Sequence, residues 1–190
     1  MTGTALWQKS AREIAAATQS GAVSAESAVE AAVTRMRQIN PDLNAVVVDL
    51  GDSAVERAAS LDKQRAAGQP CGPLHGVAVT IKINVDQTGH ATSNGVSALQ
   101  HNIAHEDAPI VRNLTNAGAV VIGRTNTPEF SFRADTDNPL HGRTHNPWGR
   151  HVSPGGSSGG AAAAVMAGFG ALAHGNDIGG SLRFPAAATG

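Results

Sequence analysis

The sequence predicts an α/β domain, because short apolar segments typical of buried strands alternate with segments that carry helix start and stop signals. Residues 77–81 are β-branched and almost wholly apolar, and residues 119–122 and 171–174 are similarly apolar. The 190 residues are enough for one domain with a hydrophobic core, and no internal repeat or linker interrupts them. We therefore expect a single α/β unit.

Two helices are expected at the start of the chain. The first includes Ile14 and ends near Gly21. Ser24 is a suitable N-cap for the second helix. We expect that helix to end at Asn40, because Pro41 follows.

A strand and a third helix complete an N-terminal helical region, residues 1–70, that we expect to pack on the core. The strand candidate is residues 45–48, a short apolar segment. Ser53, with Glu56 three residues later, resembles a capping box. This pattern predicts a helix that runs to about Ala67.

The buried strand at residues 77–81 ends at Lys82 and is followed by a long polar stretch. A helix over residues 108–117 and a strand over residues 119–122 come next. Residues 125–158 are rich in Pro, Asn, His and Gly, and they predict a loop. A loop of that length in a compact domain is usually functional.

The last segment predicts a helix over residues 160–167, a buried strand over residues 171–174 and another helix over residues 182–188. The chain stops soon after this last helix begins. We therefore expect it to be part of a longer protein.

Composition narrows the functional classes. Hydrophobic residues make up 41% of the chain, charged residues 15%, and the net charge is -1, which is a globular composition. No basic stripe and few aromatic residues argue against a nucleic-acid partner. The single cysteine, Cys71, excludes an internal disulfide. No apolar run has the length of a signal peptide or membrane span, so we expect no membrane association and a cytoplasmic location.

Two glycine-flanked serine loops lie close together between residues 153 and 185. The first, residues 155–160, contains Ser157, and the second, residues 177–181, ends in Ser181. Glycines allow close backbone approach and leave N–H groups available for an oxyanion. The first loop alone leaves anion binding and catalysis equally open, and Ser181 alone is better explained as a helix N-cap.

Lys82 stands at the end of the apolar strand. Such a lysine is more often a surface cation whose stem covers apolar residues. If the side chain is buried instead, desolvation lowers its pKa and a neutral amine can act as a general base.

The eight histidines raise the question of a metal site. His141 and His145 are four residues apart, but Gly142 lies between them and Asn146 and Pro147 follow, which disfavours a helix there. No HExxH or CxxC pattern accompanies them. We expect no metal.

Taken together, these motifs resemble the amidase signature family. The resemblance covers GPLHGVAVTIK (residues 72–82), GRTNTPEF (123–130), HNPW (145–148) and the whole stretch 153–185. The order of the motifs matches, as do the separations of 75 residues from Lys82 to Ser157 and 24 from Ser157 to Ser181. The resemblance implies an α/β/α sandwich around a mixed sheet, of which residues 71–190 form the first part, with the rest of the chain required.

The resemblance also implies a catalytic Ser–cis-Ser–Lys triad without a cofactor. Ser181 is the expected nucleophile, Ser157 the bridge and Lys82 the base, with a cis peptide between Gly156 and Ser157. The expected oxyanion hole consists of the backbone N–H groups of Ile178, Gly179, Gly180 and Ser181. The residues expected to orient these loops are Ser158, Asp177 and Arg183.

This family resemblance implies an amidase acting on a small-molecule amide, with two alternatives. One is a non-catalytic, anion-binding member or fragment, because Ile83 stands where the family usually has Asp. The other is the glutaminase-type subunit of an amidotransferase, which is disfavoured because Phe184 stands where those subunits usually carry Gln. The identity of the amide and the oligomeric state, for which a homodimer is one alternative, stay open.

Overall fold

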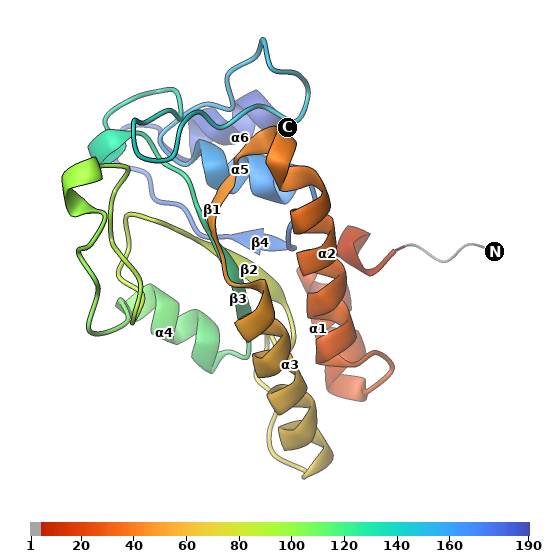
Figure 1. Cartoon of the computed structure of the whole chain (residues 1–190). Helices are drawn as coiled ribbons and strands as arrows, with labels where there is room; N and C mark the ends of the chain where they lie inside the picture. Colours follow the sequence, from red (N-terminus) through yellow and green to blue (C-terminus); the bar gives the residue numbers. More distant parts are fainter. Residues whose placement is uncertain (1–4) are drawn as a thin grey trace.

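The computed structural model describes residues 5–190 and contains a four-stranded mixed sheet (Figure 1). The strands are β1 (Val46–Asp49), β2 (Ala78–Lys82), β3 (Val120–Thr125) and β4 (Leu172–Ala173), in the order β1-β3-β2-β4. β2 runs parallel to both of its neighbours, whereas β1 is antiparallel to β3. The mixed sheet confirms the predicted α/β class.

Helices cover both faces of this sheet. They are α1 (Ala11–Ser20), α2 (Ala25–Leu43), α3 (Gly51–Ala66), α4 (Pro109–Asn116), α5 (Gly159–Met166) and α6 (Arg183–Thr189). Single 3₁₀ turns form η1 (Leu6–Gln8), η2 (Ser97–Leu99) and η3 (Glu129–Ser131). Residues from α2, α3 and α5 share one buried cluster with β1, β2 and β3, while α4 packs against β3 from the opposite side (Figure 1).

The first helix ends and the second helix begins where predicted, but the second helix ends later than expected. α1 ends before Gly21, which adopts the left-handed conformation, and the Ser24 side chain caps α2. α2 continues through Pro41, because proline in the last turn keeps a helical φ and removes only one hydrogen-bond donor. The actual end is set by Asn40, whose side-chain oxygen accepts the N–H groups of Ala45 and Val46.

The capping box predicted at Ser53 and Glu56 is wrong. α3 already begins at Gly51, and the Ser53 hydroxyl lies inside its first turn, where it donates to the Leu50 carbonyl at 3.0 Å. Asp49, the last residue of β1, instead accepts the N–H of Gly51 at 2.7 Å. α3 therefore begins almost directly after β1, and the Asp49 carboxylate takes the place of an N-cap side chain.

Two later strands differ in extent from their predictions. β3 continues past the predicted end at residue 122 to Thr125. Arg124 and Thr125 are polar and so did not fit an apolar strand pattern, but the fold buries both completely. The strand expected over residues 171–174 is reduced to the two residues of β4, which are half-buried. β4 lies at the edge of the sheet and pairs only with β2, so it is less covered than a central strand. Residues 126–158 form the predicted loop, whose expected first residue, Thr125, instead ends β3; η3 is the only helical turn within this range.

The sheet brings chemically active side chains to one edge. Side chains alternate between faces along a strand, so Lys82 points to the same face as Ala78, which belongs to the cluster shared with α2 and α5. Lys82 and Thr125 are paired at the carboxyl ends of parallel strands, and His174 follows β4 at the same edge. In parallel sheets ligands bind outside these carboxyl ends.

Candidate active site

Lys82 is the centre of a buried polar cluster. Its side chain is fully buried at the end of β2, so it does not reach the surface. Its Nζ donates to the Oγ of Ser157 at 2.7 Å, the Oγ of Ser158 at 3.1 Å and the Oδ1 of Asn176 at 2.9 Å. An ammonium group donates to all three partners, whereas a neutral amine donates to two of them and accepts a hydrogen bond from a hydroxyl through its lone pair.

The surroundings of Lys82 favour its neutral form. Burial lowers the pKa of Lys82 from 10.5 to about 8, because desolvation disfavours the charged amine. Its three partners are two hydroxyls and one amide, so no carboxylate compensates the charge within the described contacts. A pKa near 8 leaves a neutral amine populated close to neutral pH, as a general base requires.

Ser157 is held in a closely packed loop before α5. The peptide between Gly156 and Ser157 is cis, as the family resemblance implied. The Thr127 hydroxyl donates to the Ser157 carbonyl at 3.0 Å. A Cβ on Gly156 would lie 2.4 Å from the backbone oxygen of Arg133, which leaves room for glycine alone. The close approach of these two backbone segments explains why the loop has a glycine at position 156.

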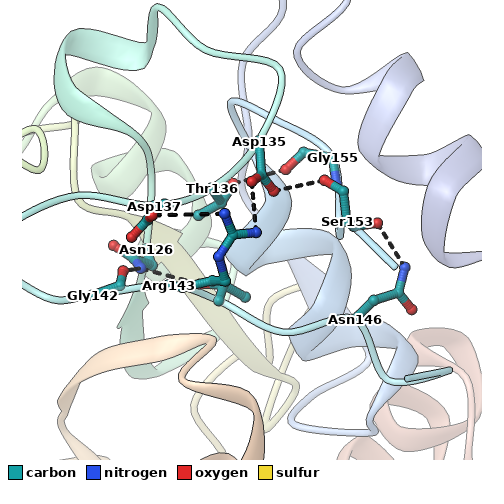
Figure 2. Close-up of polar contacts among 10 residues, drawn as sticks. Asn126, Asp135, Thr136, Asp137, Gly142, Arg143, Asn146, Ser153 and Gly155 are labelled. Atoms are coloured by element: carbon teal, nitrogen blue, oxygen red, sulfur yellow. Dashed lines mark hydrogen bonds and ion pairs between the residues drawn. The ribbon is translucent and has the colours of Figure 1, made fainter. Parts of the chain in front are cut away.

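A second network holds the segment just ahead of Ser157 (Figure 2). Asp135 accepts from Arg143 at 2.6 Å and from the Ser153 hydroxyl at 2.7 Å. The Ser153 Oγ in turn accepts the N–H of Gly155 at 3.0 Å, and Thr136 donates to the Gly155 carbonyl at 2.8 Å. Both polar groups of the Gly155 backbone are thereby anchored to residues 135–153.

Ser181 lies in the loop before α6, and Asp177 organises that loop. The Asp177 carboxylate accepts the backbone N–H groups of Gly180 at 2.7 Å and Leu182 at 3.0 Å, and it forms a two-pronged pair with Arg183 at 2.8 and 3.0 Å. The Arg183 hydrogen bonds, followed by those of the backbone, hold the pKa of Asp177 well below its usual range. The carboxylate therefore stays ionised, and the loop stays folded around it.

The two serine loops are neighbours. The N–H of Ser158 donates to the carbonyl of Ser181 at 3.1 Å, which joins the start of α5 to the loop before α6. Among residues 5–190, the backbone N–H groups of Ile178, Gly179 and Ser181 donate no hydrogen bond, whereas that of Gly180 is occupied by Asp177. Three of the four predicted oxyanion donors are therefore available.

A cavity of about 790 Å³ opens above the cluster. Both Ser157 and Ser181 line it, together with three phenylalanines. Its walls are Asn84, Asn94, Phe130, Ser131, Phe132, Arg133, Ala134, Gly156, Ser157, Asn176, Asp177, Ile178, Gly179, Gly180, Ser181 and Phe184. The arrangement gives a largely apolar chamber with hydroxyls at its base.

The amide side chains beside Lys82 were not predicted from the sequence. Asn176 contacts Lys82 directly, and Asn84 donates to Asn176 Oδ1 at 3.2 Å. Asn176 immediately precedes Asp177 in the second serine loop, but no motif marks an amide as a lysine partner. Ile83, which stands in place of the usual Asp, is buried in the apolar interior.

The histidines do not form a metal centre within the described part of the chain. Residues 5–190 contain no group of three or more His, Cys, Asp or Glu side chains arranged to hold a metal. The Nε2 of His141 lies instead 3.5 Å from the hydroxyl oxygen of Ser93.

No helix in residues 5–190 combines the length and apolar character needed to cross a membrane.

Known proteins resemble this chain along nearly its whole length. An indoleacetamide hydrolase of Bradyrhizobium diazoefficiens is 62% identical over 95% of this chain and 34% of its own length. An acylamidase of Rhodococcus erythropolis is 44% identical over 100% of this chain and 40% of its own. One subunit of the glutamyl-tRNA(Gln) amidotransferase of Symbiobacterium thermophilum is 41% identical over 90% and 35%. The chain thus spans between a third and two fifths of these relatives.

Solved structures agree with the sequence comparison. A bacterial aryl acylamidase of the amidase signature enzymes superposes with a TM-score of 0.91 at 37% identity, covering 95% of this chain and 38% of that one. Fatty acid amide hydrolase gives a TM-score of 0.94 at 31% identity, over 98% and 33%. The Amidase family profile matches residues 27–190. The chain belongs to the amidase signature family.

Proposed function

We propose that the protein carrying this chain hydrolyses the C–N bond of carboxylic amides through a serine acyl-enzyme. Ser181 is the nucleophile, Ser157 the proton bridge and Lys82 the base. The observation that carries the proposal is the buried contact of 2.7 Å between Lys82 Nζ and Ser157 Oγ, at the base of a cavity that Ser181 also lines.

The proton path follows from this order of groups. Ser181 Oγ attacks the amide carbonyl while its proton passes to Ser157, whose own proton passes to the neutral amine of Lys82. When the C–N bond breaks, the leaving nitrogen takes a proton from Ser157, which Lys82 reprotonates. Water then attacks the ester by the same path and releases the carboxylic acid and Ser181. The scheme uses no cofactor.

The loop before α6 stabilises the developing oxyanion in this proposal. The N–H groups of Ile178, Gly179 and Ser181 are the donors, since that of Gly180 already binds Asp177. Preorganised donors of this kind act most strongly where water is excluded. Ser158 supports the site through Lys82 and Ser181, and the Asp177–Arg183 pair fixes the donor loop.

We also propose the organisation of the whole protein. Residues 1–70 form a helical region that packs on the core and adds β1 to the sheet, and residues 71–190 form the first part of the amidase core. Further sequence completes the substrate pocket. The cytoplasmic location stays a prediction.

The cavity walls support an amide with an aromatic acyl group as substrate. Phe130, Phe132 and Phe184 supply aromatic surface, and Ile178 adds an apolar wall. One relative with high identity is named for indoleacetamide hydrolysis. A neutral arylacetamide therefore suits both the chemistry of the walls and the comparison.

The test measures ammonia release from indole-3-acetamide, benzamide, acetamide and glutamine by the whole protein. Ser181→Ala, Ser157→Ala and Lys82→Ala should each lose at least about 1,000-fold in kcat/KM, as expected for triad members. Ser20→Ala, on the exposed end of α1, is the matched control and should keep full activity. Substantial turnover by Ser181→Ala would refute the assignment.

The same panel separates the alternatives. Hydrolysis of glutamine alone, dependent on partner subunits, would favour a glutaminase-type subunit, for which the amidotransferase relative gives some support. A folded protein without turnover on any amide would favour an anion-binding role. The burial of Lys82 against two serine hydroxyls supports catalysis over that role.

A further inference from the structure

Asn176 is a partner of Lys82 that the proposed proton path does not use. Its Oδ1 accepts Lys82 Nζ at 2.9 Å and the Nδ2 of Asn84 at 3.2 Å. An amide oxygen has two lone pairs, so both bonds fit on the one atom. The Ser158 hydroxyl also reaches the Asn176 carbonyl at 3.3 Å, which ties the backbone of this residue to the start of α5.

The second donor to Asn176 is itself held in place. Asn84 Nδ2 also lies 3.2 Å from the Ser131 hydroxyl, and Ser131 lies 3.2 Å from the Thr127 hydroxyl. Thr127 donates to the carbonyl of Ser157 at 3.0 Å. Polar contacts therefore run from Asn176 around the base of the cavity and return to the residue that Lys82 faces.

We propose that Asn176 is a positioning residue that holds the Lys82 amine against Ser157 through an uncharged acceptor. This inference rests on the proposed function of Lys82 as the base. A lysine has a flexible four-carbon stem, so one contact to Ser157 alone does not fix its nitrogen. Asn176 approaches from the loop after β4, whereas Ser157 and Ser158 approach from the loop before α5. The nitrogen is thus held between two separate segments.

The uncharged character of Asn176 matters because Lys82 is buried. A carboxylate at this position would favour the ammonium form and work against proton uptake, whereas an amide oxygen holds the nitrogen without adding charge. The ionisable side chains on the strands and loops next to Lys82 include His174, Arg124, Asp86 and the Asp177–Arg183 pair. Among the described residues, none of them forms a hydrogen bond with Lys82. Burial lowers the pKa of His174, and the nearby charge of Lys82 lowers it further.

The test compares the pH dependence of kcat/KM for the whole protein and its Asn176→Asp and Asn176→Ala variants, with indole-3-acetamide as the probe. Asn176→Asp should move the acidic limb upward by about one pH unit or more, as expected for an opposite charge in contact. Asn176→Ala should lower kcat by about 10- to 100-fold with little change in KM, because the amine is misplaced. Asn113→Asp, on the exposed face of α4, adds the same charge away from Lys82 and should leave the profile unchanged.

A second readout separates this inference from the proposed function. The Lys82 side chain, labelled with ¹³C at Cε and assigned by its loss in Lys82→Ala, should titrate at higher pH in Asn176→Asp than in the unsubstituted protein. A raised titration in a protein that hydrolyses no amide would uphold the positioning role and reject the amidase proposal. An unmoved titration together with an unmoved acidic limb would overturn the inference, and a change confined to KM would do so as well.

Discussion

Replacing Lys82 by methionine should change how the stability of the fold depends on pH. Methionine has a similar length and is apolar, so it suits the buried end of β2 but cannot be charged. The difference between the ordinary pKa of 10.5 and the value of about 8 for the buried lysine corresponds to about 3 kcal/mol, at 1.36 kcal/mol per pH unit. That is the free energy by which burial disfavours the charged form.

The sign follows from proton binding. Between about pH 8 and pH 10.5 the unfolded chain holds a proton on Lys82 that the folded chain has released. The free energy of unfolding of the unsubstituted protein therefore gains from Lys82 as the pH rises through this range. Methionine does not titrate, so the stability of Lys82→Met relative to the parent should fall by about 3 kcal/mol from pH 7 to above pH 10.5.

Urea unfolding, followed by the fluorescence of Trp7 and Trp148, measures this difference at a series of pH values. Lys63→Met is the matched control, because it makes the same change of side chain at an exposed position on α3, away from the buried cluster. Parallel pH curves for Lys82→Met and its parent would refute the reasoning, since they would mean that burial does not lower the pKa of Lys82.

Two further predictions concern the loop that carries the serine bridge. Asp135→Asn should cost about 1 kcal/mol of stability by weakening the ion pair with Arg143, and it should slow ammonia release. Asp137→Asn, whose carboxylate lies 3.7 Å from Arg143, should change neither property. Urea unfolding and the ammonia assay compare the two variants. Gly156→Ala should destabilise the fold by about 1–3 kcal/mol or more, because its new methyl group would clash with the backbone oxygen of Arg133. Gly179→Ala, whose methyl group would meet nothing within 4 Å, should stay within about 0.5 kcal/mol of the parent in the same unfolding assay.

The sequence was sufficient for the parts of the fold that depend on local patterns. The apolar run ending at Lys82 predicted a buried strand, and Gly21 and Ser24 marked helix boundaries correctly. The start of α3 was missed because Asp49 acts from the preceding strand, which a search for a capping box does not consider. The short β4 was overestimated because its edge position is a property of the assembled sheet.

The candidate site, like the fold, could be predicted only in part from the sequence. The resemblance to the amidase signature family implied that Lys82 and Ser157 belong together, and the structure places them in contact. Asn176 could not be predicted, because an asparagine is compatible with many turns and its partner is 94 residues away. The engagement of the Gly180 N–H by Asp177 also depends on how the loop folds, which glycine content alone does not define.

The measurement that tests the central proposal most directly is the position of a covalent label. A fluorophosphonate reacts with an activated serine and forms a stable adduct in place of the acyl-enzyme. Peptide mass spectrometry of the labelled whole protein should place the adduct on Ser181, and labelling should be lost in Ser181→Ala and strongly slowed in Lys82→Ala. An adduct on another serine, or labelling of Ser181→Ala at the parent rate, would contradict the proposed mechanism.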